Sequence, residues 1–260
     1  MGAKVFFLAV LCISQSSCLY ADIQSESVLY RDGEAPLEGF IAYDDSTDQK
    51  RPGILVVHEW KGPGAYTEGR AKQLAEMGYL AFAVDMYGQG VRPKTHEEAG
   101  KAAGVYKNDR SLMRRRVKAG LEVLRMHPLV DSAKIAAIGY CFGGTTVLEL
   151  ARSGEPIKGV VSFHGALSTP RPEDAGNIKA KVLVLHGADD PFIVAQEIEA
   201  FRREMTSAGV DWRMEAYPGA VHSFTVMEAG NDPSKGAAYN KEADERSWEE
   251  MKIFFNRIFA

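Results

Sequence analysis

A cysteine between two glycines stands out among the side chains that could do chemistry. The stretch Gly139–Gly143 (GYCFG) follows the apolar segment 135–138, at the point where a helical pattern begins. Glycines in the arrangement Gly-x-Cys-x-Gly permit a sharp turn from strand to helix, which holds a nucleophile in a strained backbone conformation. The helix then starts beneath the sulfur, and a helix N-terminus favours the negative charge of a thiolate. We interpret Cys141 as a nucleophile rather than as a small buried core cysteine.

An acid and a histidine come later in the chain, in the order in which such a nucleophile finds its partners. Asp190 lies in the loop Gly187–Phe192 after an apolar strand, just before a Pro-Phe pair, and is the preferred acid. Its neighbour Asp189 is the alternative, although capping of the turn is its simpler role. His222 lies in the loop after the last predicted strand and would take the thiol proton or hold it in an ion pair. The alternative interpretation of His222 is a surface-loop histidine.

Three other histidines, His58, His164 and His186, lie at the ends of predicted strands, where a structural role is favoured over catalysis. The sequence has no helical His-Glu-x-x-His pair and no cysteine cluster. No metal site is therefore predicted.

Strands and helices alternate along most of the chain and must position these side chains. Strands are predicted at 27–30, 38–43, 54–57, 79–84, 134–139, 159–163, 182–186 and 212–217. Helices are predicted at 66–77, 111–126, 143–152, 194–207 and 240–259, and a loop with a short helix at 94–106. This alternation predicts an α/β fold with a mostly parallel central sheet of about seven to eight strands, an antiparallel start and helices on both faces. Functional groups gather beyond the carboxyl ends of such strands, where Cys141, Asp190 and His222 all fall.

Nothing in this alternation marks a boundary between domains. The sequence has no internal repeat and no low-complexity linker, and 170–174 and 230–233 read as loops. Residues 22–260 are therefore expected to form a single domain.

The first 21 residues have the pattern of a secretory signal peptide. Lys4 precedes the apolar run Val5–Ile13, and small and polar residues follow as far as Ala21. The apolar run is too short to cross a bilayer, so no membrane span is predicted. A mature chain that starts near Asp22 is expected to be exported, either to a periplasm or as a secreted protein.

Export changes what the cysteines can do. Anchoring of a lipoprotein at Cys18 is less favoured, because Gln15 stands where such signals usually have an aliphatic residue. Loss of Cys12 and Cys18 with the leader would leave Cys141 alone, and a single cysteine cannot form an internal disulfide. A lone thiol in an oxidising compartment needs deep burial or a chemical task.

Composition and charge limit the classes of partner. The chain of 260 residues is 45% hydrophobic and 25% charged, which is typical of a globular protein. A net charge of −4 and an isoelectric point near 5.9 leave no basic stripe for nucleic acid. The run Arg114–Arg116 lies in a helical pattern that also carries acids, and we interpret it as a solvated helix face.

These motifs together resemble the dienelactone hydrolase family of α/β-hydrolases. The resemblance runs from about Glu38 to the C-terminal helix. Five stretches carry it: VVHEW at 56–60, AVDMYG at 83–88, GYCFGG at 139–144, GADDPF at 187–192 and HSF at 222–224. The resemblance implies an α/β-hydrolase fold, a triad of Cys141, Asp190 and His222, and no cofactor.

The resemblance also implies a fourth acid and an oxyanion hole. Glu59 matches an acid that in such enzymes contacts the nucleophile and helps control its ionisation, and a solvated loop glutamate is the alternative. The backbone N–H groups of Phe142 and Trp60 would form the oxyanion hole. The implied reaction is attack of the Cys141 thiolate on a small ester or lactone, followed by hydrolysis of a thioester acyl-enzyme by water activated at His222.

One position departs from the family pattern. Dienelactone hydrolases hold a substrate carboxylate with arginines, one of them four residues after the catalytic histidine, and the matching residue here is Val226. An apolar side chain cannot form that ion pair. Arg92 or Arg110 could substitute for it, or could have a surface role. Dienelactone itself is therefore not the expected substrate.

Two other functions could use the same residues. An exported ligand-binding protein could keep the pocket without turnover, and an amide or peptide hydrolase could use the same nucleophile. Thiol redox sensing is disfavoured, because Cys141 has no resolving cysteine in the mature chain. The sequence leaves the oligomeric state and the natural substrate open.

Overall fold

A computed structural model describes residues 23–260, so the predicted signal peptide, Cys12 and Cys18 lie outside the described residues. The strands are β1 (Ile23–Asp32), β2 (Ala35–Asp44), β3 (Arg51–Val57), β4 (Leu80–Val84), β5 (Val130–Tyr140), β6 (Gly159–Phe163), β7 (Lys181–Gly187) and β8 (Trp212–Tyr217). The helices are α1 (Ala65–Glu76), α2 (His96–Asn108), α3 (Arg110–Met126), α4 (Phe142–Arg152), α5 (Ala195–Ser207) and α6 (Lys241–Phe259), with short 3₁₀ helices η1 (Pro172–Asn177), η2 (Met227–Ala229) and η3 (Pro233–Lys235).

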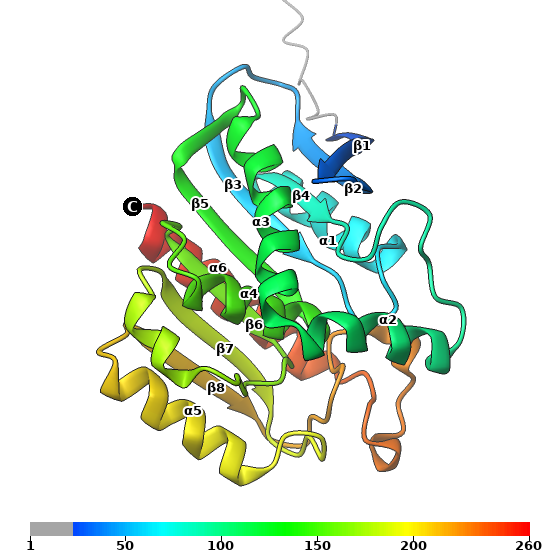
Figure 1. The fold of residues 1–260 in the computed structure, drawn as a ribbon, viewed down its shortest axis with the longest axis vertical. Coiled ribbons are helices and arrows are strands. Elements are labelled where there is room, and N and C mark those ends of the chain that lie inside the picture. The colour runs from blue at the N-terminus through cyan, green and yellow to red at the C-terminus, as the bar shows by residue number, and fades with distance from the viewer. Residues whose placement is uncertain (1–22) are drawn as a thin grey trace, which may run out of the picture.

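All eight strands belong to one sheet, in the order β1-β2-β4-β3-β5-β6-β7-β8 (Figure 1). β2 pairs antiparallel with both β1 and β4, and the remaining pairs are parallel. This arrangement confirms the predicted mostly parallel α/β sheet with an antiparallel start. None of the helices within residues 23–260 is both long enough and apolar enough to cross a membrane.

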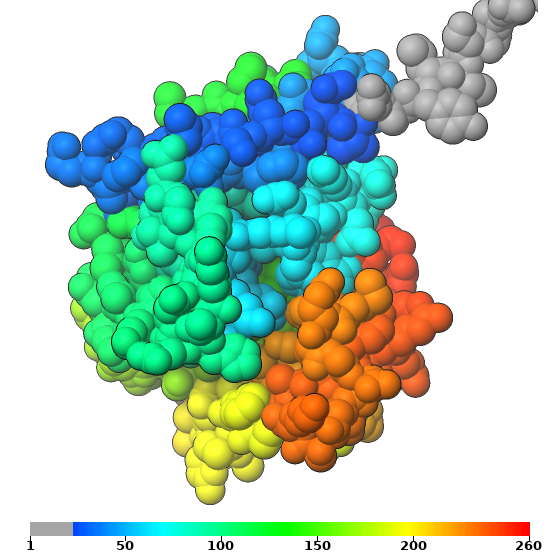
Figure 2. All heavy atoms as spheres, turned by 90° about the vertical axis from the view of Figure 1, so that its right-hand side faces the viewer, coloured from blue at the N-terminus to red at the C-terminus, as the bar shows by residue number. Residues whose placement is uncertain are grey.

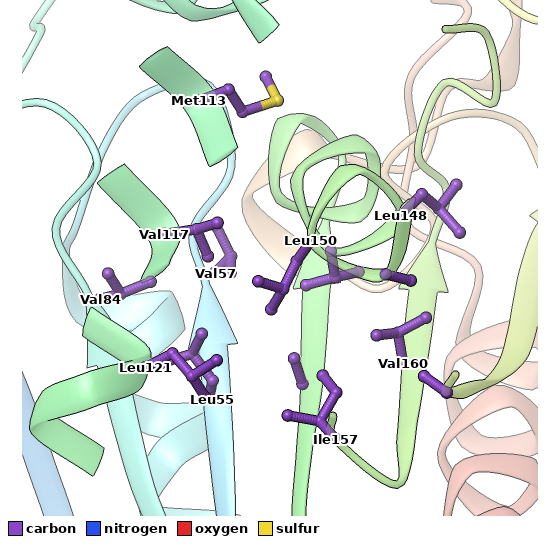
Figure 3. Packing of buried hydrophobic residues seen from close by; sticks show 14 of the residues in the cluster. Leu55, Val57, Val84, Met113, Val117, Leu121, Leu148, Leu150, Ile157 and Val160 are labelled. Atoms are coloured by element: carbon purple, nitrogen blue, oxygen red, sulfur yellow. The ribbon is translucent and has the colours of Figure 1, made fainter. Parts of the chain in front are cut away.

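The two faces of the sheet carry separate halves of the core. In β3, Leu55 and Val57 point to the face covered by α3, α4 and α5, where they share a cluster with Val117 of α3 (Figure 3). Ile54 and Val56 point to the opposite face, which α1 and α6 cover. Successive side chains of a strand alternate between faces, and both faces are buried here. The strand therefore appears in the sequence as an unbroken apolar run.

Several elements are longer than predicted from the sequence, among them β1 and α2. β1 has ten residues, whereas a strand was expected only at 27–30. α2 is a helix of 13 residues, whereas a loop with a short helix was expected at 94–106. A capping box begins it, because the Thr95 side chain accepts the Glu98 N–H and the Glu98 side chain accepts the Thr95 N–H. The segments read as loops at 170–174 and 230–233 contain the first turns of η1 and η3.

The arginine run in α3 is not a solvated face, and that interpretation was wrong for two of its three residues. Arg114 pairs with Glu149 of α4 at 2.7 Å and with Asp174 of η1 at 2.5 Å. Arg116 is buried and donates to Asp32 of β1 at 2.9 Å. Only Arg115 is largely exposed. The run therefore joins α3 to three other elements.

Further buried ion pairs join α4, the helix that follows Cys141, to α5, and they share Glu149 with Arg114. The fully buried Arg152 donates to Glu149 at 3.1 Å and to both oxygens of Glu204 at 2.7 and 2.9 Å. It also donates to the carbonyl of Leu167, in the loop after β6, at 2.9 Å. Four bonds to three segments fix the C-terminal end of α4 against its neighbours.

We expect Arg152→Met to lower the free energy of unfolding by about 3–5 kcal/mol, because the variant leaves the buried Glu204 carboxylate without its guanidinium partner and leaves Glu149 paired with Arg114 alone. Urea unfolding followed by circular dichroism measures this. Lys101→Met is the matched control, since it breaks an ion pair whose two side chains are each 76% exposed, and should cost no more than about 0.5 kcal/mol. Equal losses in the two variants would contradict a role for the buried cluster.

Candidate active site

The predicted strand-to-helix turn is present at Cys141. β5 ends at Tyr140 and α4 begins at Phe142, so Cys141 alone makes the turn, with φ at 53°. Side chains with a Cβ rarely adopt this left-handed region, and such residues cluster at functional sites. The Cys141 N–H is held by the carbonyl of Phe163 at 3.0 Å and by Nδ1 of His164 at 3.1 Å. Its side chain is partly exposed at the carboxyl edge of the sheet.

Glycines at 139 and 143 are required by contact between backbones. A Cβ on Gly139 would lie 2.0 Å from the carbonyl oxygen of Gly143, and a Cβ on Gly143 would lie 2.2 Å from the carbonyl oxygen of Val57. Neither gap admits a methyl group. The two glycines thus let α4 start directly against β3 and β5, as the motif predicts.

The three residues expected to meet at this edge do meet. His222 Nε2 lies 3.0 Å from Cys141 Sγ, and His222 Nδ1 lies 2.8 Å from Asp190 Oδ2. A buried carboxylate can only accept, so Nδ1–H is the donor and Nε2 faces the sulfur. The other oxygen of Asp190 accepts the Phe192 N–H at 2.9 Å, which fixes the carboxylate. Asp189 instead accepts the Gly219 N–H at 3.0 Å, which joins the loop after β7 to the loop after β8.

The loop that carries His222 is fixed by its own backbone. The His222 N–H donates to the Gly236 carbonyl at 3.2 Å, and its carbonyl accepts the Ala238 N–H at 3.0 Å. The ring of Phe192 meets the imidazole edge-on, with centroids 5.4 Å apart. The imidazole is thereby held from the loop, from the acid and from an aromatic neighbour.

The surroundings of His222 favour its protonated form. Burial opposes the positive charge, but the hydrogen bonds to Asp190 and to Cys141, together with the negative charges of these partners, outweigh it and raise the pKa of His222 to about 10. The pair can therefore exist as a thiolate beside an imidazolium.

Glu59 lies beside the site, and its hydrogen bond is with the residue that follows His222. Its Oε1 accepts from Ser223 Oγ at 3.3 Å, and within residues 23–260 it forms no hydrogen bond with Cys141. Burial raises the pKa of Glu59, while the nearby charge of His222 and the Ser223 bond oppose that change. Glu59 is thus near the imidazole and bonded to the residue after it, rather than to the sulfur.

The two backbone N–H groups expected to stabilise an oxyanion lie on elements that meet here. Phe142 is the first residue of α4, and Trp60 lies in the loop after β3. Neither N–H donates to an acceptor within residues 23–260. Both groups thus lack a protein acceptor in this part of the chain, and the Trp60 backbone is fixed because its carbonyl accepts from Tyr87 at 2.7 Å.

A buried histidine that the sequence analysis took as structural positions the loop with Trp60. His58 Nδ1 donates to the Glu59 carbonyl at 2.5 Å, and Nε2 accepts the Met86 N–H at 3.2 Å. Burial lowers the pKa of His58 to about 4, so the ring stays neutral and keeps both bonds. Its place at the end of β3 is the only signal of this task in the sequence.

Within residues 23–260, no three His, Cys, Asp or Glu side chains lie close enough together to bind a metal ion.

A model of the dienelactone hydrolase family matches residues 37–259. The chain belongs to this family. The dienelactone hydrolase family comprises hydrolases with the α/β-hydrolase fold, and the eight-stranded sheet order described above is that fold.

Known proteins of this kind resemble the chain over most of its length. A solved "Dienelactone Hydrolase-like Promiscuous Phospotriesterase P91" from metagenomic libraries is 38% identical, with a TM-score of 0.86, and the match covers 92% of this chain and 99% of that one. A structure named m3DLH is 37% identical, with a TM-score of 0.88 and the same coverage. A "Putative carboxymethylenebutenolidase" from Saccharolobus solfataricus is 25% identical over 90% of this chain and 98% of its own.

This member of the dienelactone hydrolase family has a pocket beside Glu59. The pocket has a volume of about 330 Å³ and lies between the start of α1 and the loop after β8. Figure 2 shows the hollow between the cyan and orange segments of the surface. Lys61, Val226 and Glu228 line it with Glu59. Val226 therefore places an apolar group in this pocket, at the position where the resemblance led us to look for an arginine.

We expect the His222 imidazole to stay protonated up to about pH 10 in a nitrogen-15 NMR titration. In Cys141→Ala the pKa of His222 should fall toward 6.5, because the sulfur that favours the charged ring is gone. His127 contacts neither residue and should titrate identically in both proteins. A wild-type His222 that titrates near 6.5 would contradict the ion pair.

The same titration has a consequence for stability. The folded-state pKa of His222 is raised above its ordinary value, so its protonation stabilises the fold. This contribution is complete below about pH 6.5 and is lost as the pH rises through about 10. The difference in unfolding free energy between wild type and His222→Gln should therefore shrink across that interval.

Proposed function

We propose that the protein hydrolyses small ester or lactone substrates through a thioester acyl-enzyme, with Cys141 as nucleophile, His222 as acid and base, and Asp190 as the group that orients His222. The observation that carries the proposal is the continuous contact from Sγ to Nε2 at 3.0 Å and from Nδ1 to the Asp190 carboxylate at 2.8 Å. Such a chain activates a nucleophile and holds its base in one tautomer.

The reaction proceeds in two halves. With the thiol proton already on Nε2 of His222, the thiolate forms a bond to the substrate carbonyl carbon while the carbonyl oxygen becomes an oxyanion. The N–H groups of Phe142 and Trp60 stabilise that oxyanion. The carbon–oxygen ester bond then breaks, and the leaving oxygen receives the proton from Nε2. In the second half, water gives a proton to Nε2 and attacks the thioester, and the thiolate leaves.

We propose that substrates bind in the pocket beside Glu59, and that neutral substrates fit it better than anionic ones. The pocket beside Glu59 contains two acids and one lysine, and Val226 offers a carboxylate no partner. A buried or half-buried carboxylate without a cation is unfavourable, since its desolvation is not compensated. We therefore propose uncharged, short acyl or lactone substrates, with no cofactor. On the strength of its predicted signal peptide, we propose that the protein acts outside the cytosol.

A phosphotriester is a second class to assay, because a relative 38% identical to this chain is described as a promiscuous phosphotriesterase. The same thiolate and oxyanion donors could serve attack at phosphorus. Amide hydrolysis and ligand binding without turnover are the two alternative functions of the site. Transfer of an acyl group to the sulfur distinguishes both hydrolytic functions from ligand binding, and the relative rates on an ester and on the matching amide distinguish ester from amide hydrolysis.

Cys141→Ala should lower kcat for a chromogenic short-chain ester by at least about 1,000-fold, because it removes the nucleophile while leaving the fold and oxyanion donors. Mass spectrometry of the wild-type protein quenched during turnover should find the acyl group on Cys141. A variant that retains the parental rate would rule out the proposed chemistry. Binding of the ester with no acylation would favour the ligand-binding function.

Val226→Arg should raise kcat/KM for a carboxylate-bearing ester about 10-fold relative to a neutral ester of the same size, because one half-buried ion pair is worth about 1–1.5 kcal/mol. Val226→Gln is the control of similar length without charge and should leave the ratio unchanged. A wild-type preference for anionic lactones would contradict the proposed substrate class.

A further inference from the structure

His164 contacts the backbone of the nucleophile and is not part of the Cys141, His222 and Asp190 contacts. It follows β6 directly, is fully buried and has a left-handed backbone, with φ at 40°. Its own N–H donates to the Leu185 carbonyl at 2.8 Å, which fixes the residue to β7. Nδ1 is 3.1 Å from the Cys141 nitrogen, and Nε2 is 2.8 Å from Thr225 Oγ1.

These two contacts define the tautomer of the ring. The Cys141 nitrogen carries a hydrogen and can only donate, so His164 Nδ1 must be bare. Nε2 then carries the hydrogen and donates to Thr225 Oγ1. An imidazolium has a hydrogen on both nitrogens and would lose the first bond, and so would the opposite neutral tautomer. The geometry is therefore specific for one of three protonation forms.

Thr225 favours that tautomer, because contacts with α1 hold Thr225 in place independently of His164. Its hydroxyl lies 2.6 Å from the Tyr66 hydroxyl of α1, and its carbonyl accepts from Arg70 at 3.1 Å. Arg70 is itself paired with Asp244 of α6 at 2.5 Å. Thr225 is three residues after His222, so one buried chain links the turn at Cys141 to the loop of the histidine that contacts its sulfur.

Charged and titratable groups around the ring keep it neutral. Burial lowers the pKa of His164 well below its ordinary value, and the positive charges of His222, Arg70 and His186 lower it further. These neighbours come from the loop after β8, from α1 and from β7. The aromatic rings of Tyr140, on β5, and Phe224 complete the surroundings.

We propose that His164 is a positioning residue, whose bare Nδ1 shares the Cys141 N–H with the Phe163 carbonyl and thereby keeps the sulfur in contact with His222. Thr225 holds the ring in the tautomer that does this. The effect on turnover rests on the proposed function, whereas the effect on the thiol does not. The state of the sulfur can therefore be tested without any substrate.

The test compares His164→Asn with His164→Gly. Both residues tolerate a left-handed backbone, but only asparagine offers an acceptor near the position of Nδ1. The readout is the rate of alkylation of Cys141 by iodoacetamide from pH 5 to 10, measured by mass spectrometry of the Cys141 peptide. Asparagine should retain the wild-type profile within about 3-fold, and glycine should lose at least about 10-fold at pH 7 and converge with wild type in alkali.

Thr225→Val is a second variant that leaves residue 164 intact. Without an acceptor for Nε2–H, the ring can move its hydrogen to Nδ1, and the alkylation profile should shift in the same direction as in the glycine variant. This keeps the proposal testable if His164→Gly does not fold.

A purely structural role would lower the unfolding midpoint and leave the profile of the folded protein unchanged. The proposal would therefore be overturned if His164→Gly has the wild-type alkylation profile. If His164→Gly does not fold, the same result in Thr225→Val would overturn it. Shifted profiles in a protein without esterase activity would support positioning and refute the proposed function. Unshifted alkylation profiles in a protein with esterase activity would refute positioning by His164 and support the proposed function.

Discussion

The position of the sulfur depends on backbone segments that approach one another more closely than side chains would allow. Gly139 of β5 and Gly143 of α4 lie in direct contact, and Gly144 meets Gly165 after β6 in the same way. Because of these contacts α4 begins right at the edge of the sheet, and the chain must turn within a single residue. Cys141 takes the left-handed conformation that this requires, at a cost in strain that the surrounding packing sustains. The thiol is thus presented by the packing of the backbone around it rather than by contacts of its own side chain.

Three histidines lie around this turn, and their partners set them in different protonation states. His222 faces a carboxylate and a sulfur, both of which favour a charged ring. His58 and His164 each accept a backbone N–H, and burial keeps them neutral. Environments that push the pKa values of similar groups apart in this way are typical of acid–base sites. Here the charged imidazole faces the reacting atom, whereas the neutral ones hold the backbone on either side of it.

Much of this site could be predicted because its members each follow a strand that the apolar pattern reveals. Parallel strands bring their carboxyl ends to one edge, so order along the chain becomes proximity in space. Side-chain direction is different, since it depends on partners far away in sequence. Glu59 reaches the predicted edge but bonds to Ser223. Arg114 and Arg116 were misread because their partners, Asp174 and Asp32, lie 60 residues later and 84 residues earlier in the chain. Periodicity carries no information about such pairs.

The apolar residue at 226 is consistent with the charges around it. Glu59 and Glu228 share its pocket with Lys61, so acids already outnumber bases there. A substrate carboxylate would meet two like charges in that lining and a single cation, Lys61. The imidazolium of His222 offers little compensation, because its charge is matched by the thiolate that its own proton transfer creates. In the proposed reaction, the ionisation that makes Cys141 reactive therefore also leaves the site suited to uncharged substrates.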